Sequence, residues 1–196
     1  ELASIGFQRV YSFEPIRETF ERFGRNLMLN PQLQDRIVPI KSGVASNDGV
    51  LKFLLNVDSA GQNKLVPERP FNESEFEQIE ECPVTTLASV FKKHELDHVR
   101  LLKVDVEGFE PHVLKGGNDL LGNGRVEFLY IEVIPEALRD AGSSQDELRL
   151  LVSELGFVPV IPLATSGKFE TVTFDKALLC AGQERNILLR HRSHVR

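Results

Sequence analysis

The chain has little cysteine, and its two cysteines stand far apart. Cys82 and Cys180 form no Cys-x-x-Cys pair, and the histidines do not cluster along the sequence either. Because metal-binding motifs bring such ligands together at short spacings, the sequence argues against structural zinc. Two isolated cysteines also fit a reducing compartment, and we expect a cytoplasmic location.

Long apolar runs and an excess of positive charge are missing as well. A membrane-spanning helix needs about 20 consecutive apolar residues, and no such run occurs. The 23 Lys and Arg residues are outnumbered by 29 Asp and Glu residues, which gives a net charge of −6. We therefore expect no nucleic-acid partner. Basic residues do gather at positions 190–196, but they are few, and we interpret this segment as a solvated tail.

The length and the order of the apolar segments favour one α/β domain over residues 1–196. Hydrophobic residues make up 41% of the 196, enough for a sizeable core. Segments typical of strands alternate with segments typical of helices, which predicts a doubly wound sheet. We expect strands at 10–13, 37–44, 50–55, 101–106, 126–134, 157–163, 171–174 and 177–180, the last ones antiparallel. We expect helices from Pro15 to about 30, at 84–94 with Thr86 as a possible cap, after position 108 and at 145–155. The polar segment 58–81 reads as a loop or lid with a short helix near 74–79.

The most informative segment is Leu101–Gly117, in which an apolar strand runs into charged residues, a glycine and a helix. The apolar positions are typical of a strand buried on both faces in a parallel sheet. Lys103, Asp105 and Glu107 alternate with them, so all three side chains should point to one side. Gly108 would permit the sharp turn into the helix. Ligands bind at the carboxyl ends of strands in such sheets, so we expect the chemistry here.

The sequence allows several interpretations of Asp105 and Glu107. Lys103 could form an ordinary salt bridge with Asp105 or Glu107. The two carboxylates could instead raise each other's pKa, which suits a general base, or hold a divalent cation. Glu132 ends the neighbouring strand and could reach the same pocket.

The histidines give a weaker signal. His112 follows in the first turn of the next helix and could act as a base near neutral pH. A lone helical histidine usually has no such role. The other four, at positions 94, 98, 191 and 194, have no helpful context in the sequence.

Glu14 marks a second candidate site. It ends the strand 10–13, just before a helix. In nucleotide-binding α/β folds, an acid at this place accepts hydrogen bonds from a ribose diol. A solvated acid favoured by the dipole of the helix N-terminus explains the position equally well.

Two ordered motifs resemble the FkbM-type S-adenosylmethionine-dependent methyltransferases. The first is KVDVEGFEPHVLKGG followed by EFLYIEV, and the second, earlier in the chain, is VYSFEPIRETFERFGRNLMLN. The segment VTTLASVF before the charged strand is similar to the family's usual lead-in. The resemblance covers residues 9 to about 160.

The resemblance implies a Rossmann-like class I methyltransferase sheet, largely parallel with a late antiparallel strand. It implies that S-adenosylmethionine is the cofactor and that the acceptor is a hydroxyl group of a small molecule or sugar. On this pattern the ribose lies on Glu14 and the methionine end faces Val104 to Glu107. The implied cofactor-binding residues are Glu14, Pro15, Gly43, Val44 and Asp105. The implied proton acceptors are Glu107, Glu132 and His112.

One part of the family pattern is not found in residues 1–196. The family's first strand carries a loop of the type Asp-x-Gly-Ala-Asn-x-Gly, and residues 2–6 look like the end of the helix that follows it. We therefore expect a truncated chain whose missing first strand belongs between the strands that end at Glu14 and Glu107. Such a chain would be inactive by itself. The alternatives are a non-catalytic Rossmann-like binding module and a metal-dependent enzyme that uses Asp105, Glu107 and Glu132.

Overall fold

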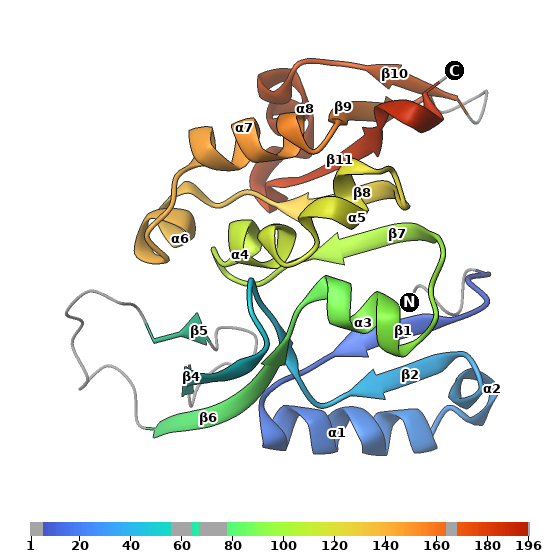
Figure 1. Ribbon diagram of the computed structural model, residues 1–196, viewed down its shortest axis with the longest axis vertical. Coiled ribbons are helices and arrows are strands. Elements are labelled where there is room, and N and C mark those ends of the chain that lie inside the picture. The colour runs from blue at the N-terminus through green and yellow to red at the C-terminus, as the bar shows by residue number, and fades with distance from the viewer. Residues whose placement is uncertain (1–5, 56–63, 67–77, 164–167, 196) are drawn as a thin grey trace. The chain divides into compact units, whose positions relative to one another are not determined.

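The computed structural model describes residues 6–55, 64–66, 78–163 and 168–195 (Figure 1). The expected helix end at 2–6 lies almost wholly outside these residues; Gly6, which is described, lies in a turn. The chain forms two compact units. The first comprises residues 1–66 and 72–85, and the second comprises residues 67–71 and 86–196.

In its described residues, the first unit contains two α-helices and two small sheets. Strand β1 (Val10–Phe13) pairs in parallel with β2 (Ile37–Ile40). Between them lie α1 (Arg17–Met28) and α2 (Pro31–Gln34). A four-stranded sheet has the order β3-β6-β4-β5. Its strands are β3 (Gly43–Val44), β4 (Gly49–Leu55), β5 (Lys64–Leu65) and β6 (Gln78–Thr85).

Local signals explain much of this unit. The strand 10–13 and the helix that follows it are confirmed, and α1 ends before Asn30-Pro31 as expected. The single strand expected at 37–44 is wrong, because it divides at Ser42. The Ser42 hydroxyl donates to the carbonyl oxygens of Gly43 and Pro83, at 2.9 and 3.2 Å. The chain thereby leaves the β1 pairing and joins β6 instead.

The second unit is built on a five-stranded mixed sheet of order β10-β9-β11-β8-β7. Its strands are β7 (Val99–Val104), β8 (Val126–Glu132), β9 (Phe157–Pro162), β10 (Phe169–Thr171) and β11 (Asn186–His191). The β7–β8 pair is parallel, whereas β11 runs antiparallel to both β8 and β9.

Eight short helices belong to this unit in the described part of the chain. They are α3 (Leu87–Lys93), α4 (Glu110–Lys115), α5 (Asn118–Gly122), α6 (Pro135–Asp140), α7 (Gln145–Glu154), α8 (Phe174–Ala181) and the 3-10 turns η4 (Gly182–Glu184) and η5 (Arg192–His194). The Thr86 hydroxyl accepts a bond from Ser89 N–H and caps α3, as the sequence predicts. Helix α8 packs on β9 and β11, and α7 packs on β9 and α4.

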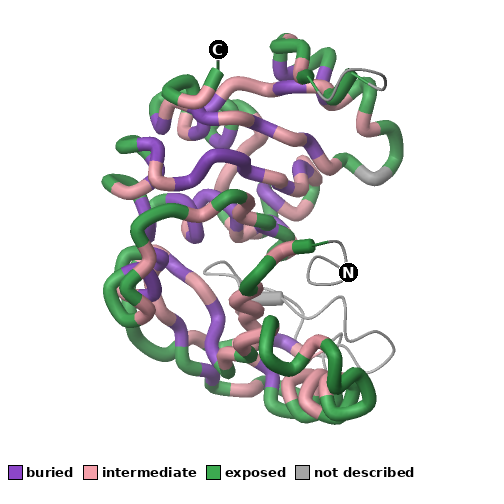
Figure 2. The backbone as a smooth tube through the Cα atoms, turned by 90° about the vertical axis from the view of Figure 1, so that its right-hand side faces the viewer, coloured by how far each residue is buried: buried purple, intermediate pink, exposed green. Residues whose placement is uncertain are grey.

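The core of this unit lies along β8 and β11. Leu129 and Ile131 on β8 and Leu189 on β11 have no exposed surface. Figure 2 shows the buried positions in purple along the backbone. By contrast only Val104 of β7 is buried, whereas Arg100 and Lys103 are exposed, so the expectation of a strand buried on both faces is wrong. It lies at the edge of the five-stranded sheet, where β8 is its neighbour.

The C-terminal third differs most from expectation. Residues 177–180 belong to α8 rather than to a strand, and the strand expected at 171–174 ends at Thr171. A short apolar run is compatible with either a strand or a helix. The helix forms here, and the Thr173 hydroxyl caps its N-terminus by accepting a bond from Lys176 N–H at 3.2 Å. The expected solvated tail is also wrong. Arg190 and His191 lie in β11, and the His191 side chain is buried.

The segment expected to be a loop or lid is partly a strand. Gln78 to Glu81 belong to β6 and pair with β4, so the helix expected near 74–79 does not include Gln78 or Ile79. The rest of that expected helix, residues 74–77, lies outside the described residues.

The fold class is confirmed as mixed α/β with parallel and antiparallel strands. Antiparallel pairs are more frequent than expected, because β4 pairs with both β5 and β6 in addition to the late strands. Within the described residues, β1 pairs with β2 alone and β7 with β8 alone. The missing strand expected between β1 and β7 stays a prediction, as does the single domain. No helix among the described residues is long and apolar enough to cross a membrane.

Candidate active site

The turn between β7 and α4 has an unusual backbone. Glu107 has a φ of +54° and Gly108 has a φ of +98°. A Cβ atom at position 108 would lie 2.2 Å from the carbonyl oxygen of Ala137 in α6. Glycine is therefore required at this position by both the dihedral angle and the space. The turn and the helix that follows β8 are packed backbone against backbone.

Glu110 holds this turn from inside. Its Oε1 accepts bonds from the N–H groups of Val106 and Gly108, at 3.1 and 3.2 Å. The residue is only 1% exposed, and burial raises the pKa of its carboxyl group above the ordinary value. The spacing of the acidic residues in the sequence does not distinguish Glu110 as a site residue. The available signal was its place beside Pro111 at the start of a helix, where an acid can satisfy unpaired N–H groups.

Three other carboxylates gather at the carboxyl ends of β7 and β8. One ligand oxygen from each of Asp105, Glu107 and Glu132 lies within 4.8 Å of the others. The predicted convergence of these acids is thereby confirmed for this unit. Lys103 Nζ forms an ion pair with Asp105 Oδ2 at 2.8 Å, which raises the pKa of Lys103. One positive charge therefore lies beside three acids.

The environment of Glu132 favours its neutral form. Burial, and then the charges of Asp105, Glu107 and Glu110, raise the pKa of Glu132 to about 7, while Lys103 opposes the shift. Its Oε2 atom is buried and has no hydrogen-bond partner among the described residues. This carboxyl group can thus take up or release a proton near neutral pH, which is the property required of a general base.

His112 lies in α4, directly after the turn between β7 and α4. Its ring stacks on the ring of Phe109, with centroids 4.0 Å apart and planes inclined by 4°. Its side chain is half-buried in the first turn of α4. The predicted role of His112 as a base stays a prediction.

The second predicted cluster lies in the first unit, around Glu14. Glu14 Oε1 accepts a bond from Ile16 N–H at 2.8 Å, and burial raises the pKa of this carboxyl group. A Cβ at Gly43 would lie 3.7 Å from Pro15 Cβ and 3.1 Å from Val84 Cγ1. The structure thus brings Pro15 and Gly43 together, and Val44 follows in β3.

The family model of the methyltransferase FkbM domain matches residues 6–159. The chain belongs to the FkbM family of methyltransferases. The matched range includes the Glu14 cluster and all of the β7–α4 and β8 carboxylates. It ends within β9, before β10 and β11.

The chain is similar to two known methyltransferases. The first is the hexuronic acid methyltransferase AglP of Haloferax volcanii, 27% identical over 148 residues. The match covers 74% of this chain and 53% of AglP, so the chain spans about half the length of that relative. The second is the crystal structure of the methyltransferase FkbM of Methylobacillus flagellatus, with a TM-score of 0.53 and 16% identity. That match covers 97% of this chain and 39% of the solved chain, and it supports the fold.

Proposed function

We propose that this protein transfers a methyl group from S-adenosylmethionine to a hydroxyl group of a sugar, with Glu132 as the base. The observation that carries the proposal is the convergence of Asp105, Glu107 and Glu132 at the carboxyl ends of two parallel strands, where burial and the neighbouring acids raise the pKa of Glu132 to about 7. Membership of the FkbM family and the similarity to a hexuronic acid methyltransferase support the reaction class and a sugar acceptor.

Residues of each unit, taken separately, suit one part of the proposed cofactor. Glu14 has one oxygen fixed by Ile16 N–H, so its carboxylate is oriented to accept hydrogen bonds from a ribose diol. Asp105 and Glu107 offer negative charge to the cationic methionine end. The cofactor supplies an electrophilic methyl group on a positively charged sulfur. The protein's own task is then to position the acceptor and to remove its proton.

We propose that Asp105, Glu107 and Glu132 have different roles in this reaction. Lys103 holds Asp105 in place through the 2.8 Å ion pair, so Asp105 acts mainly on the cofactor side. We propose that Glu107, in the turn after β7, faces the acceptor. The Oε2 atom of Glu132 is buried and has no hydrogen-bond donor in the described part of the chain, and a substrate hydroxyl would satisfy it. Glu132 would take up that proton and pass from carboxylate to carboxylic acid, while the substrate oxygen gains the methyl group and the sulfur–methyl bond breaks.

A sugar acid offers two kinds of oxygen to a methyltransferase, a hydroxyl and a carboxylate. The acidic cluster favours the hydroxyl. Three carboxylates within 4.8 Å repel an anionic acceptor, and a carboxylate acceptor has no proton that would need a base. The product is accordingly expected to be an ether rather than an ester.

The test is a transfer assay on the full-length protein with radiolabelled S-adenosylmethionine and a panel of neutral sugars and hexuronic acids. We expect label in a sugar product that survives mild alkali, because ethers are stable where methyl esters hydrolyse. Alkali-labile label would contradict hydroxyl transfer. Binding of the cofactor without any transfer across the panel would favour the non-catalytic binding module.

A divalent cation on Asp105, Glu107 and Glu132 is the second candidate, since their ligand atoms lie within 4.8 Å of one another. In that case transfer would stop in EDTA and return with added Mg²⁺. Under the first proposal, activity in EDTA is unchanged.

A further inference from the structure

A second cluster of ligand-type side chains lies at the opposite ends of the same two strands. His98 immediately precedes β7, Glu127 is the second residue of β8, and His194 closes η5 after β11. One ligand atom from each lies within 4.8 Å of the others. The six residues of β7 separate this cluster from Asp105 by about 20 Å, at about 3.3 Å per residue. It therefore belongs to a different site from the carboxylates described above.

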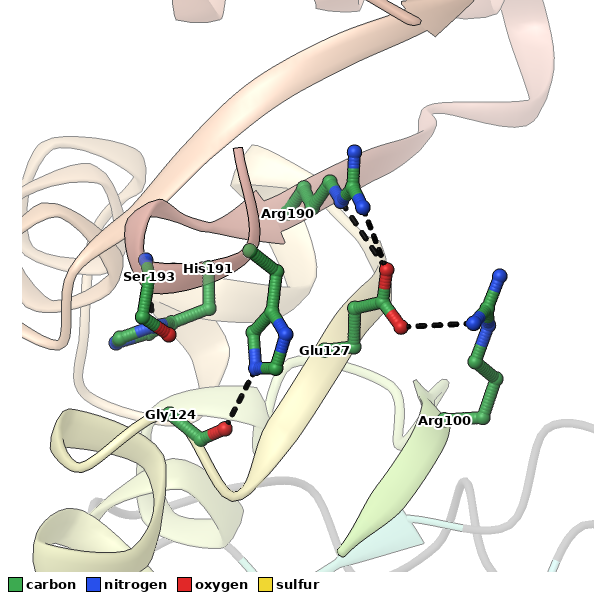
Figure 3. A network of polar contacts seen from close by, with 7 residues as sticks. Arg100, Gly124, Glu127, Arg190, His191 and Ser193 are labelled. Carbon is green, nitrogen blue, oxygen red and sulfur yellow. Dashed lines mark hydrogen bonds and ion pairs between the residues drawn. The ribbon is translucent and has the colours of Figure 1, made fainter. Parts of the chain in front are cut away.

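Glu127 is buried and firmly oriented. Its side chain is 7% exposed, and Arg190 donates to Oε1 from both Nε and Nη2, at 3.2 and 2.8 Å. The other oxygen, Oε2, faces Arg100 Nη1 at 3.0 Å. Figure 3 shows Glu127 between the two arginines, which approach its two oxygens separately. The Arg100 side chain is 66% exposed, so it can leave Oε2 without opening the core.

His194 is arranged as a ligand. Its Nε2 lies 2.9 Å from the carbonyl oxygen of Gly124, the contact drawn from Gly124 in Figure 3. A carbonyl oxygen can only accept, so Nε2 carries the proton and Nδ1 keeps its lone pair. Metal-binding histidines in proteins commonly donate their second N–H to a carbonyl in this way. The His98 ring lies beside it, with the two ring centroids 5.5 Å apart.

The segment that carries His194 is fixed by its neighbour His191. The His191 ring is buried, and its Nδ1 lies 2.7 Å from Ser193 Oγ. A Cβ on Gly156 would lie 2.6 Å from His191 Nε2, and a Cβ on Gly124 would lie 2.8 Å from Nδ1. The ring thus fills the space that these two glycines leave. It holds η5 against the start of β8.

We propose that His98, Glu127 and His194 bind a zinc ion, with water in the fourth position. Two imidazole nitrogens and one carboxylate oxygen are a set that zinc takes in proteins, whereas magnesium and calcium prefer oxygen alone. Tetrahedral zinc with bonds of about 2.0–2.2 Å sets its ligand atoms about 3.4 Å apart. The present separation of up to 4.8 Å closes by a small movement of His98, which is exposed.

The proposed ion replaces Arg100 on Oε2, while Arg190 keeps Oε1. The ion ties the last turn of the chain to the beginnings of two sheet strands, and its expected effect is on stability. The three ligands are far apart in the sequence, which is why the ligand spacing there gave no sign of zinc. The proposal does not depend on the proposed methyl transfer.

The test is calorimetric titration of the tag-free, full-length protein with zinc chloride, together with thermal unfolding at each zinc concentration. We expect one saturable site and a melting temperature that rises with zinc. His98→Gln and His194→Gln should each weaken binding about tenfold or more. The matched control is His94→Gln, which changes another histidine outside the cluster and should leave the affinity unchanged. Arg100→Gln should strengthen binding, because it removes the competing cation.

Three outcomes would overturn the proposal. The first is the lack of saturable zinc binding. The second is an affinity unchanged in His98→Gln, a substitution at an exposed position that the fold tolerates. The third is weaker zinc binding in Glu107→Gln, which would place the ion on the other carboxylate cluster. Zinc-edge X-ray absorption on the loaded protein should show two imidazole ligands, and a shell of oxygen alone would also contradict the site.

Discussion

Gly108 and Ala137 meet backbone to backbone, and a Cβ at position 108 would lie 2.2 Å from the Ala137 carbonyl oxygen. Because Gly108 also has a φ of +98°, Gly108→Ala combines a clash with a strained dihedral angle. We expect it to lower the free energy of unfolding by about 2–4 kcal/mol in urea titrations. The control is Gly122→Ala, since nothing lies within 4 Å of a Cβ there. Equal stability of both variants would mean that the turn adapts freely.

Glu110 gives a second test of the same turn. Glu110→Ala leaves the N–H groups of Val106 and Gly108 without their acceptor and opens a cavity, so we expect a loss of about 2–4 kcal/mol. Glu110→Gln retains an oxygen acceptor and should keep most of the stability. Urea unfolding of the three proteins measures the difference. If Glu110→Ala proves as stable as wild type, the buried carboxyl does not support the turn.

The stability of the protein should depend on pH through Glu132. Its folded-state pKa of about 7 lies above the ordinary 4.5, so the folded protein binds more protons between these values. The free energy of unfolding therefore decreases as the pH rises from about 4.5 to about 7 and Glu132 loses its proton. At pH 8, Glu132→Gln should be more stable than wild type by about 1–2 kcal/mol, since solvent screens a half-buried charge. The two proteins should have equal stability near pH 4. A stability difference that is the same at both pH values would exclude a raised pKa.

Cofactor binding should depend on Glu14. Glu14→Gln keeps the shape of the side chain and removes the charged acceptor for the ribose, and charge-assisted bonds contribute about 1.5–3 kcal/mol. We expect S-adenosylmethionine to bind roughly tenfold to a hundredfold more weakly in calorimetry of the full-length protein. The matched control is Glu18→Gln, an exposed acid in the first turn of α1. An unchanged affinity in Glu14→Gln would mean that Glu14 does not bind the cofactor and is only an acid near a helix N-terminus.

Features set by nearby residues could be predicted from the sequence. The strand 10–13, the helix after Pro15 and the Thr86 cap depend on local signals and are confirmed. The convergence of Asp105, Glu107 and Glu132 also followed, because parallel strands end at the same sheet edge.

Features set by distant pairing could not be predicted in this way. Strand β11 lies between β8 and β9, and only that pairing buries His191 and brings His194 to Glu127. The same holds for Glu110, whose burial depends on how the turn closes over it. Residues 177–180 show the other difficulty, since a short apolar run fits a strand and a helix equally well.

The most direct test of the proposed reaction is the pH profile of kcat/KM for wild type and Glu132→Gln in the full-length protein. With Glu132 as base, wild-type kcat/KM should rise about tenfold per pH unit below pH 7 and level off above it. Glu132→Gln should be slower by about 10²–10⁴-fold and lose that rise, while the exposed control Glu154→Gln behaves as wild type. A flat wild-type profile, or full activity in Glu132→Gln, would contradict the account.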